Sequence, residues 1–174
     1  RGLGDVYKRQ IPAMKQVNVK EGTSSVAQPV KVVADGRLSR EKAYADEMLQ
    51  HRNLSGEGGT TLELSLMSRA DVQNSAARDN AEYYELTING NKVTVKGVTD
   101  DAVMNGVKAY IKILDRNFGK KTVPNVAVCD WPDLHYRGMM LDIARNFSKA
   151  DDLKRLINQL AFFNMNVFLS LIHI

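Results

Sequence analysis

The side chains that could do chemistry are few, and most of them lack a partner at a useful spacing. The chain of 174 residues has one cysteine, Cys129, and 3 histidines, so it offers neither a disulfide framework nor a Cys/His zinc site. His51 and His135 have no partner at ligand spacing. Cys129 ends a short apolar run and is better explained as a small buried residue than as a nucleophile. We therefore expect no metal and no cofactor.

Two further motifs resemble catalytic motifs in their residue types, but their expected structural context does not fit. Asp46-Glu47 is an adjacent carboxylate pair, but it falls inside an expected helix and is interpreted as solvated surface. The glycine-rich run 56–59 does not join a strand to a helix, as a phosphate-binding loop must. Neither motif predicts a catalytic site.

Asp142 and Arg145 are placed differently, because they lie at the end of the nearly continuous apolar run 138–144. Such a run is typical of a strand buried on both faces of a parallel sheet. A guanidinium offers five N–H donors in a fixed fork, which suits two adjacent hydroxyl groups. Arg145 could equally be an exposed arginine that begins a loop. Asp142 could pair with an arginine and hold its orientation, or it could cap the backbone at the strand end.

The chain up to residue 131 predicts an α+β unit, an antiparallel sheet with two helices on one face. Asn89-Gly90 stands between two alternating runs and predicts a β-hairpin. Ser39 is the expected cap of the first helix and Thr99-Asp100 precedes the second. The expected strands are short pieces over 11–36 and runs near 62–67, 84–88 and 92–96, and the expected helices cover roughly 40–51 and 100–115.

The pattern changes at residues 130–133, which predict a linker because Pro132 biases Trp131 away from helix. Trp131 is expected to pack at this junction. Beyond it, the sequence predicts a strand over 138–144 with Met139 and Met140 in a core, then a helix that starts at the capping-box pattern 148–151 and ends at Asn164. A second strand opens at 165–168. One βαβ unit cannot close a core, so we expect the chain to be cut inside a larger domain.

Both ends of the chain differ from the rest. Residues 1–10 show no clean period, and residues 169–174 stop in mid-strand; both resemble translated sequencing-adapter sequence and are left out of the fold prediction. The formal net charge of +4 falls to +2 without residues 1–10. The basic character that would suggest a nucleic-acid partner is therefore weak, and no apolar run of 18 residues predicts a membrane span.

Residues 136–147, followed by the helix and Asn166-Val167-Phe168, closely resemble the start of the catalytic barrel of glycoside hydrolase family 20, the β-N-acetylhexosaminidases. Residues 84–88 and 102–107 resemble the smaller α+β domain that precedes this barrel. The resemblance covers about 11–168. It implies a hexosaminidase-type accessory domain over 11–131 and the first βαβ of a truncated (β/α)8 TIM barrel over 132–168.

The resemblance also implies the reaction, which is the retaining, substrate-assisted hydrolysis of terminal N-acetylhexosamine residues from glycans. Arg145 occupies the position of the arginine that grips the terminal sugar's hydroxyls, with Asp142 as possible support. Arg137 is expected to anchor the domain junction, and Asn146 stands where many relatives carry His. The family's catalytic Asp–Glu pair lies on a later strand, so this chain holds no catalytic residue and is expected to be inactive by itself.

The implied partner is a glycan that ends in N-acetylglucosamine or N-acetylgalactosamine. Because the family mostly acts outside the cytosol, a periplasmic or secreted location is expected, although no signal peptide is visible. Two alternatives stay open. One is a non-catalytic module that binds a glycan or a protein. The other is a relative of the O-linked N-acetylglucosamine hydrolases, whose first barrel strand has a different motif from residues 141–145.

Overall fold

The computed structural model describes residues 12–145 and 148–171, and the chain divides into two compact units between Pro132 and Asp133. The sequence prediction placed its boundary one residue earlier. Residues 1–10, which the sequence analysis sets apart as foreign, lie outside the described residues, as do 172–174. In the described part, no helix is both long enough and apolar enough to cross a membrane.

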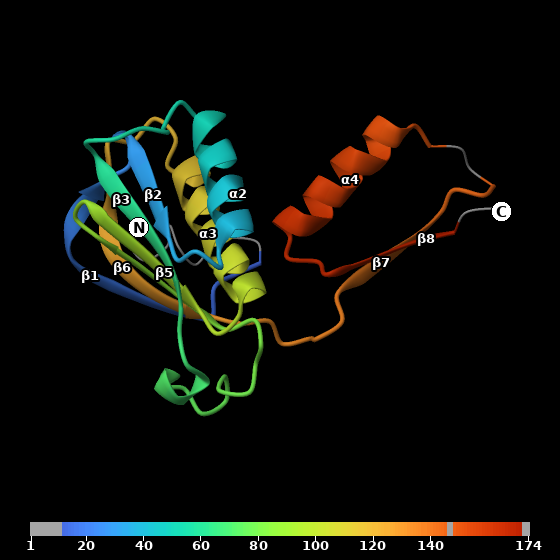
Figure 1. Cartoon of the computed structure of the whole chain (residues 1–174), viewed down its shortest axis with the longest axis horizontal. Coiled ribbons are helices and arrows are strands. Elements are labelled where there is room, and N and C mark those ends of the chain that lie inside the picture. Colours follow the sequence, from blue (N-terminus) through green and yellow to red (C-terminus); the bar gives the residue numbers. More distant parts are fainter. Residues whose placement is uncertain (1–11, 146–147, 172–174) are drawn as a thin grey trace. The chain divides into compact units, whose positions relative to one another are not determined.

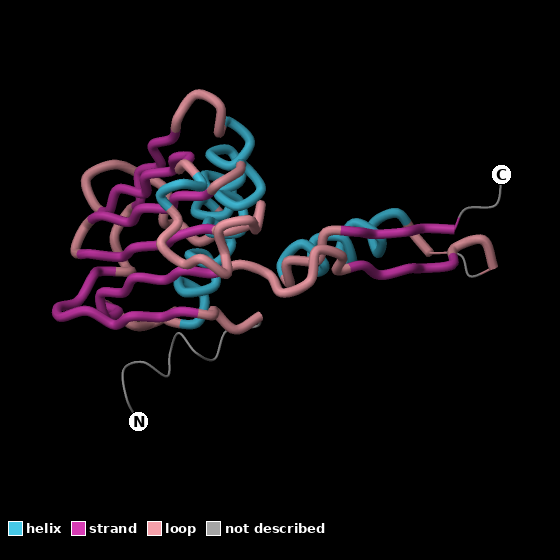
Figure 2. The backbone as a smooth tube through the Cα atoms, turned by 90° about the horizontal axis from the view of Figure 1, so that it is seen from below, coloured by secondary structure: helices cyan, strands magenta, loops and turns pink. Residues whose placement is uncertain are grey.

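The first unit contains a six-stranded sheet in the order β1-β6-β4-β5-β3-β2 (Figures 1 and 2). The strands are β1 (Gln16–Ser25), β2 (Val30–Ala34), β3 (Thr60–Leu66), β4 (Tyr84–Asn89), β5 (Lys92–Gly97) and β6 (Thr122–Asp130). β4 pairs antiparallel with both β5 and β6, whereas β3 pairs parallel with both β2 and β5. The prediction of an antiparallel sheet was therefore wrong. The helix between β2 and β3 carries the chain back along the sheet, so that both strands run in the same direction.

Two helices, α2 (Ser39–Gln50) and α3 (Asp100–Arg116), cover one face of this sheet, as predicted (Figure 1). A short 3-10 helix, η1 (Arg69–Asp71), lies in the connection between β3 and β4. The core forms where inward residues of the strands meet the helices. Its fully or almost fully buried members include Leu62, Leu64, Leu86, Ile88, Val93, Val95, Val126 and Val128 from the sheet, and Ala45, Leu49, Val103, Val107 and Tyr110 from the helices.

The hairpin prediction is confirmed, with its loop one residue further along than the Asn-Gly pair suggests. Asn89 pairs with Lys92, so Gly90 and Asn91 form the two-residue loop. Gly90 has φ 59°, the left-handed backbone that a type II′ turn requires at its first central position.

The predicted helix caps are only partly right. Thr99 caps α3, its hydroxyl accepting from the backbone N–H of Ala102. Ser39 is instead the first residue of α2 and follows Leu38, which gives no side-chain cap. The capping-box prediction for residues 148–151 was also wrong, because the C-terminal helix begins at Ala150, one residue later than the pattern requires, and Lys149 precedes it without a side-chain cap.

The second unit is a βαβ element of β7 (Gly138–Asp142), α4 (Ala150–Phe162) and β8 (Val167–Leu171), with β7 and β8 parallel. Asn164 ends the helix in the left-handed conformation, with φ 58°. Met139 and Met140, predicted as core residues, are 38% and 61% exposed. Two strands and one helix cannot cover both faces of a sheet, so in the described residues these side chains have too few neighbours to be buried. β8 includes residues 169–171, which the sequence analysis sets apart as foreign.

Candidate functional site

Asp142 and Arg145 meet at the C-terminal end of β7. One carboxylate oxygen of Asp142, Oδ1, accepts hydrogen bonds from the backbone N–H groups of Ala144 at 3.0 Å and Arg145 at 3.3 Å. The other oxygen, Oδ2, lies 3.0 Å from Arg145 Nε. Asp142 thus does both things that the sequence left open, since it caps the backbone and pairs with the arginine.

The exposure of the Asp142 and Arg145 side chains determines whether a ligand can reach them. The Arg145 side chain is 86% exposed and that of Asp142 is 27% exposed. The ion pair uses Nε of the guanidinium, and no hydrogen bond from a described residue reaches the two terminal nitrogens. A guanidinium that is held at one edge presents its remaining donors in a fixed direction, which suits a ligand with paired hydroxyl groups. Asn146 lies outside the described residues.

Arg137 and Asn166 join the beginnings of the two strands of the second unit. Arg137 donates from Nε to the carbonyl of Asn164 at 2.7 Å and from Nη1 to the carbonyl of Leu134 at 2.5 Å. Asn166 accepts from the backbone N–H of Arg137 at 2.9 Å and donates to the carbonyl of His135 at 2.6 Å. These bonds lie at the opposite end of β7 from Arg145, so Arg137 organises the backbone there and contributes nothing to the Asp142 pair.

The end of the first unit is built around Trp131. Its ring packs against Tyr83 with centroids 5.9 Å apart, and the Lys15 ammonium lies 4.8 Å above it. The predicted packing role of Trp131 is confirmed. Burial raises the pKa of the Cys129 thiol, which keeps the thiol protonated and argues against a nucleophile.

Asp130 is the last residue of β6 and is buried, although the sequence predicted a linker there. It accepts from the Tyr84 hydroxyl at 3.0 Å and from the backbone N–H of Lys15 at 3.2 Å. Burial raises the pKa of this carboxyl despite these hydrogen bonds. Asp130 therefore belongs to the internal structure of the first unit.

The remaining sequence candidates form no site. Asp46 pairs with Lys42 at 2.6 Å on the surface of α2, and Glu47 is 65% exposed, so the interpretation of this pair as solvated surface is confirmed. His51 is exposed beside Glu47, and His135 is exposed as well. Within residues 12–145 and 148–171, no group of three potential ligand side chains could hold a metal ion.

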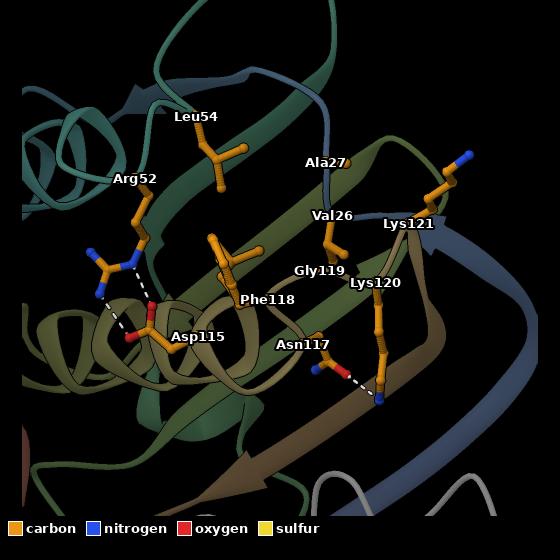
Figure 3. Close-up of a pocket in the computed structure, with 11 residues that line it drawn as sticks. Val26, Ala27, Arg52, Leu54, Asp115, Asn117, Phe118, Gly119, Lys120 and Lys121 are labelled. Carbon is orange, nitrogen blue, oxygen red and sulfur yellow. Dashed lines mark hydrogen bonds and ion pairs between the residues drawn. The ribbon is translucent and has the colours of Figure 1, made fainter.

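One pocket in the first unit was missed by the sequence analysis (Figure 3). It forms where the ends of α2 and α3 meet the connection between β1 and β2, and Phe118 is one of the residues that line it. A large apolar residue directly before a glycine, just after a helix, was the available signal.

Both parts of the chain match models of one protein family. A model described as glycosyl hydrolase family 20, domain 2, matches residues 9–131, and the catalytic-domain model of the same family matches 134–173. The chain belongs to glycosyl hydrolase family 20. Asp142 and Arg145 therefore lie in the part of this family 20 chain that matches the catalytic domain.

Individual relatives agree with the family assignment. A β-hexosaminidase from Vibrio vulnificus is 27% identical over 96% of this family 20 chain, which spans 19% of that relative. A second β-hexosaminidase, from Vibrio furnissii, is 31% identical over 49% of the chain, which spans 14% of its length. The chain thus corresponds to only a small part of each relative.

Solved structures share the fold. The family 20 exo-β-N-acetylglucosaminidase from Vibrio harveyi in complex with N-acetylglucosamine superposes with a TM-score of 0.75 at 23% identity, over 94% of this chain and 25% of that one. The chitobiase from Flavobacterium johnsoniae gives a TM-score of 0.71 at 23% identity, over 95% of this chain and 27% of its own.

Proposed function

We propose that this family 20 chain is the accessory domain and the first βαβ of the TIM barrel of an exo-acting β-N-acetylhexosaminidase. The observation that carries the proposal is the Asp142–Arg145 pair at the C-terminal end of β7. Barrel enzymes place their binding and catalytic groups at this end of the strands. The small share of each relative that the chain spans supports a larger parent protein.

Within that enzyme, Arg145 binds the hydroxyl groups of the terminal N-acetylhexosamine, and Asp142 fixes the direction of the guanidinium. The reaction is retaining and substrate-assisted, with the acetamido oxygen of the sugar as the nucleophile. An Asp–Glu pair on a later barrel strand orients the acetamido group and supplies the general acid. This chain contributes binding and orientation, and the bond is broken by groups that it does not contain.

The names of the relatives support this substrate class, since they include β-hexosaminidases and an N,N′-diacetylchitobiase from Vibrio harveyi. We infer that the parent acts outside the cytosol, in the periplasm or as a secreted protein, where polymeric glycans are found.

The test compares two proteins on one substrate, an aryl N-acetyl-β-glucosaminide that releases a chromophore. The product of the complete gene should hydrolyse it with retention at the anomeric carbon, and the 174-residue chain should not. Retention is read by NMR from the first anomer that appears. A complete product that shows no turnover, or that inverts the anomeric centre, would overturn the proposal. Turnover by the 174-residue chain would overturn the assignment of the general acid to a later strand.

The second candidate, a non-catalytic glycan-binding module, is favoured by the pocket at Phe118. The two functions are compatible, since a hydrolase can hold its substrate at a second site.

A further inference from the structure

The pocket at Phe118 has a volume of about 330 Å³ and lies entirely in the first unit. This volume is at the lower end of the ~300–1,000 Å³ range of small-molecule sites, so it fits a small ligand. Three separate segments form its walls, from the end of α2, the end of α3 and the connection between β1 and β2 (Figure 3). The apolar lining residues are Val26, Ala27, Leu54, Leu114 and Phe118.

Phe118 is 89% exposed, the largest exposed fraction among the large apolar residues that the structure describes. An aromatic ring is one of the largest apolar surfaces a side chain can bury, and leaving it in water forgoes that stabilisation. Its neighbour Gly119 has φ 83°, a left-handed backbone that glycine adopts without strain. The turn directly after α3 therefore presents the ring at the pocket instead of burying it.

Polar groups with unused hydrogen-bonding capacity surround the ring. Arg52 donates from Nε and Nη2 to the two carboxylate oxygens of Asp115, at 2.6 and 2.7 Å. Each of these oxygens keeps a second lone pair. On the other side of the ring, Lys120 donates one of its three N–H groups to Asn117 Oδ1 at 3.0 Å (Figure 3). The rim thus offers both acceptors and donors, and the Arg52–Asp115 pair holds the acceptors in place.

The rim carries charges of both signs, with two lysines beside the Arg52–Asp115 pair. Arg52, Lys120 and Lys121 carry positive charge, but Arg52 is paired with Asp115. The pocket also lies at the C-terminal ends of α2 and α3, where the helix dipoles place partial negative charge. An anion could use only the lysines and would face these helix ends and the Asp115 carboxylate, whereas a hydroxyl or an amide can donate to Asp115 and also accept from a lysine.

We propose that this pocket binds a neutral sugar ring of the N-acetylhexosamine class, as a glycan-binding site separate from the reaction. The apolar face of the ring stacks on Phe118. The hydroxyl groups bond to Asp115 and Lys120, and the acetamido methyl contacts the wall of Val26 and Leu54. The choice of an acetamido sugar rests on the proposed function, while the stacking and the hydrogen-bonding rim do not.

The experiment titrates the 174-residue chain with N,N′-diacetylchitobiose and follows backbone amide signals by NMR. We expect saturable shifts at Gly119 and Lys120, and at least about tenfold weaker binding by Phe118→Ala. Phe118→Tyr should keep the affinity, because it keeps the ring. Phe163→Ala, which removes another exposed phenylalanine in the second unit, should bind as the unchanged chain does. Thermal unfolding of each variant checks that it is folded.

Several outcomes would overturn the proposal. Absence of saturable shifts, or equal binding by Phe118→Ala and Phe163→Ala, would show that the pocket is not a sugar site. Tighter binding of inorganic phosphate than of the disaccharide would make it an anion site. Equal affinity for cellobiose, which lacks the acetamido groups, would remove the N-acetyl specificity. The titration needs no catalysis, so it can fail while the complete enzyme is active, or succeed while the hydrolase assignment fails.

Discussion

The carboxylate of Asp142 accepts hydrogen bonds from both the backbone and the side chain of Arg145, with Oδ1 3.3 Å from the arginine N and Oδ2 3.0 Å from its Nε. The two residues are three apart at the end of β7, and the carboxylate fixes both the loop and the guanidinium that the loop carries. The arginine is thereby oriented without being buried, since 86% of its side chain stays exposed. A residue that must meet a soluble ligand in a fixed direction needs this combination.

Removing the carboxylate should weaken substrate binding by the parent enzyme. We expect Asp142→Ala to raise KM by roughly threefold to tenfold with a smaller change in kcat, because a charge-assisted hydrogen bond that positions Arg145 is lost. Asp142→Asn should have a smaller effect, since its amide oxygen can still accept from the backbone. Steady-state kinetics measures both. Asp152→Ala is the matched control, because Asp152 pairs with Arg155 on α4 at the same i,i+3 spacing. Equal KM values for Asp142→Ala and Asp152→Ala would contradict the role of Asp142.

Lys112 should make the free energy of unfolding of the chain depend on pH in the alkaline range. This lysine is 5% exposed, and burial, with a smaller effect of Lys108, lowers its pKa to about 8, against 10.5 in the ordinary case. Between these values the unfolded chain binds the proton more strongly, so the free energy of unfolding rises with pH. Relative to Lys112→Met, the unchanged chain should gain about 1–3 kcal/mol between pH 8 and 10.5. Urea unfolding at several pH values measures the difference, and a pH-independent difference would contradict the lowered pKa.

Gly106 lets α3 pack closely against side chains of the sheet. A Cβ at this position would clash with Val95 Cγ1 and would lie 3.0 Å from Tyr84 Cδ2. We expect Gly106→Ala to destabilise the chain by about 1–3 kcal/mol, because the helix must move away from well-packed neighbours. Gly36→Ala is the control, since a Cβ there meets nothing within 4 Å. Chemical denaturation measures both variants, and a Gly106→Ala chain as stable as Gly36→Ala would show that the packing is looser than described.

Local signals predicted most of the helices and the hairpin, but not the strand directions. The alternation around Asn89-Gly90 and the apolar stripe of α3 are contained in a few consecutive residues. The parallel pairing of β2 with β3 depends on where α2 lays the chain, which no local pattern encodes.

β6 is not among the strands expected from the sequence, and Pro124 by itself argues against a strand in the middle of a sheet. In the structure Pro124 faces Thr23, directly beyond the irregularity that interrupts the β1 register between Val19 and Thr23. The disturbed ladder tolerates a residue without an N–H group. This compensation lies about a hundred residues away in sequence, so the segment could not be assigned from its own composition.

The two candidate sites also differ in how far the sequence alone could predict them. Asp142 and Arg145 are three residues apart, and their pairing could be anticipated from that spacing. The pocket at Phe118 needs segments from three parts of the chain, and Val26 and Leu54 carry no signal that would connect them to Phe118.

The most direct measurement of the central claim is kcat/KM of the complete enzyme on an aryl N-acetyl-β-glucosaminide, with Arg145→Ala compared to Arg155→Ala. Both arginines are well exposed, at 86% and 76%, and each pairs with an aspartate three residues earlier, so neither change should alter folding. If Arg145 holds the terminal sugar, Arg145→Ala lowers kcat/KM by at least about 100-fold, as expected for the loss of two charge-assisted hydrogen bonds, and Arg155→Ala leaves it unchanged. Equal kcat/KM values for the two variants would contradict the account.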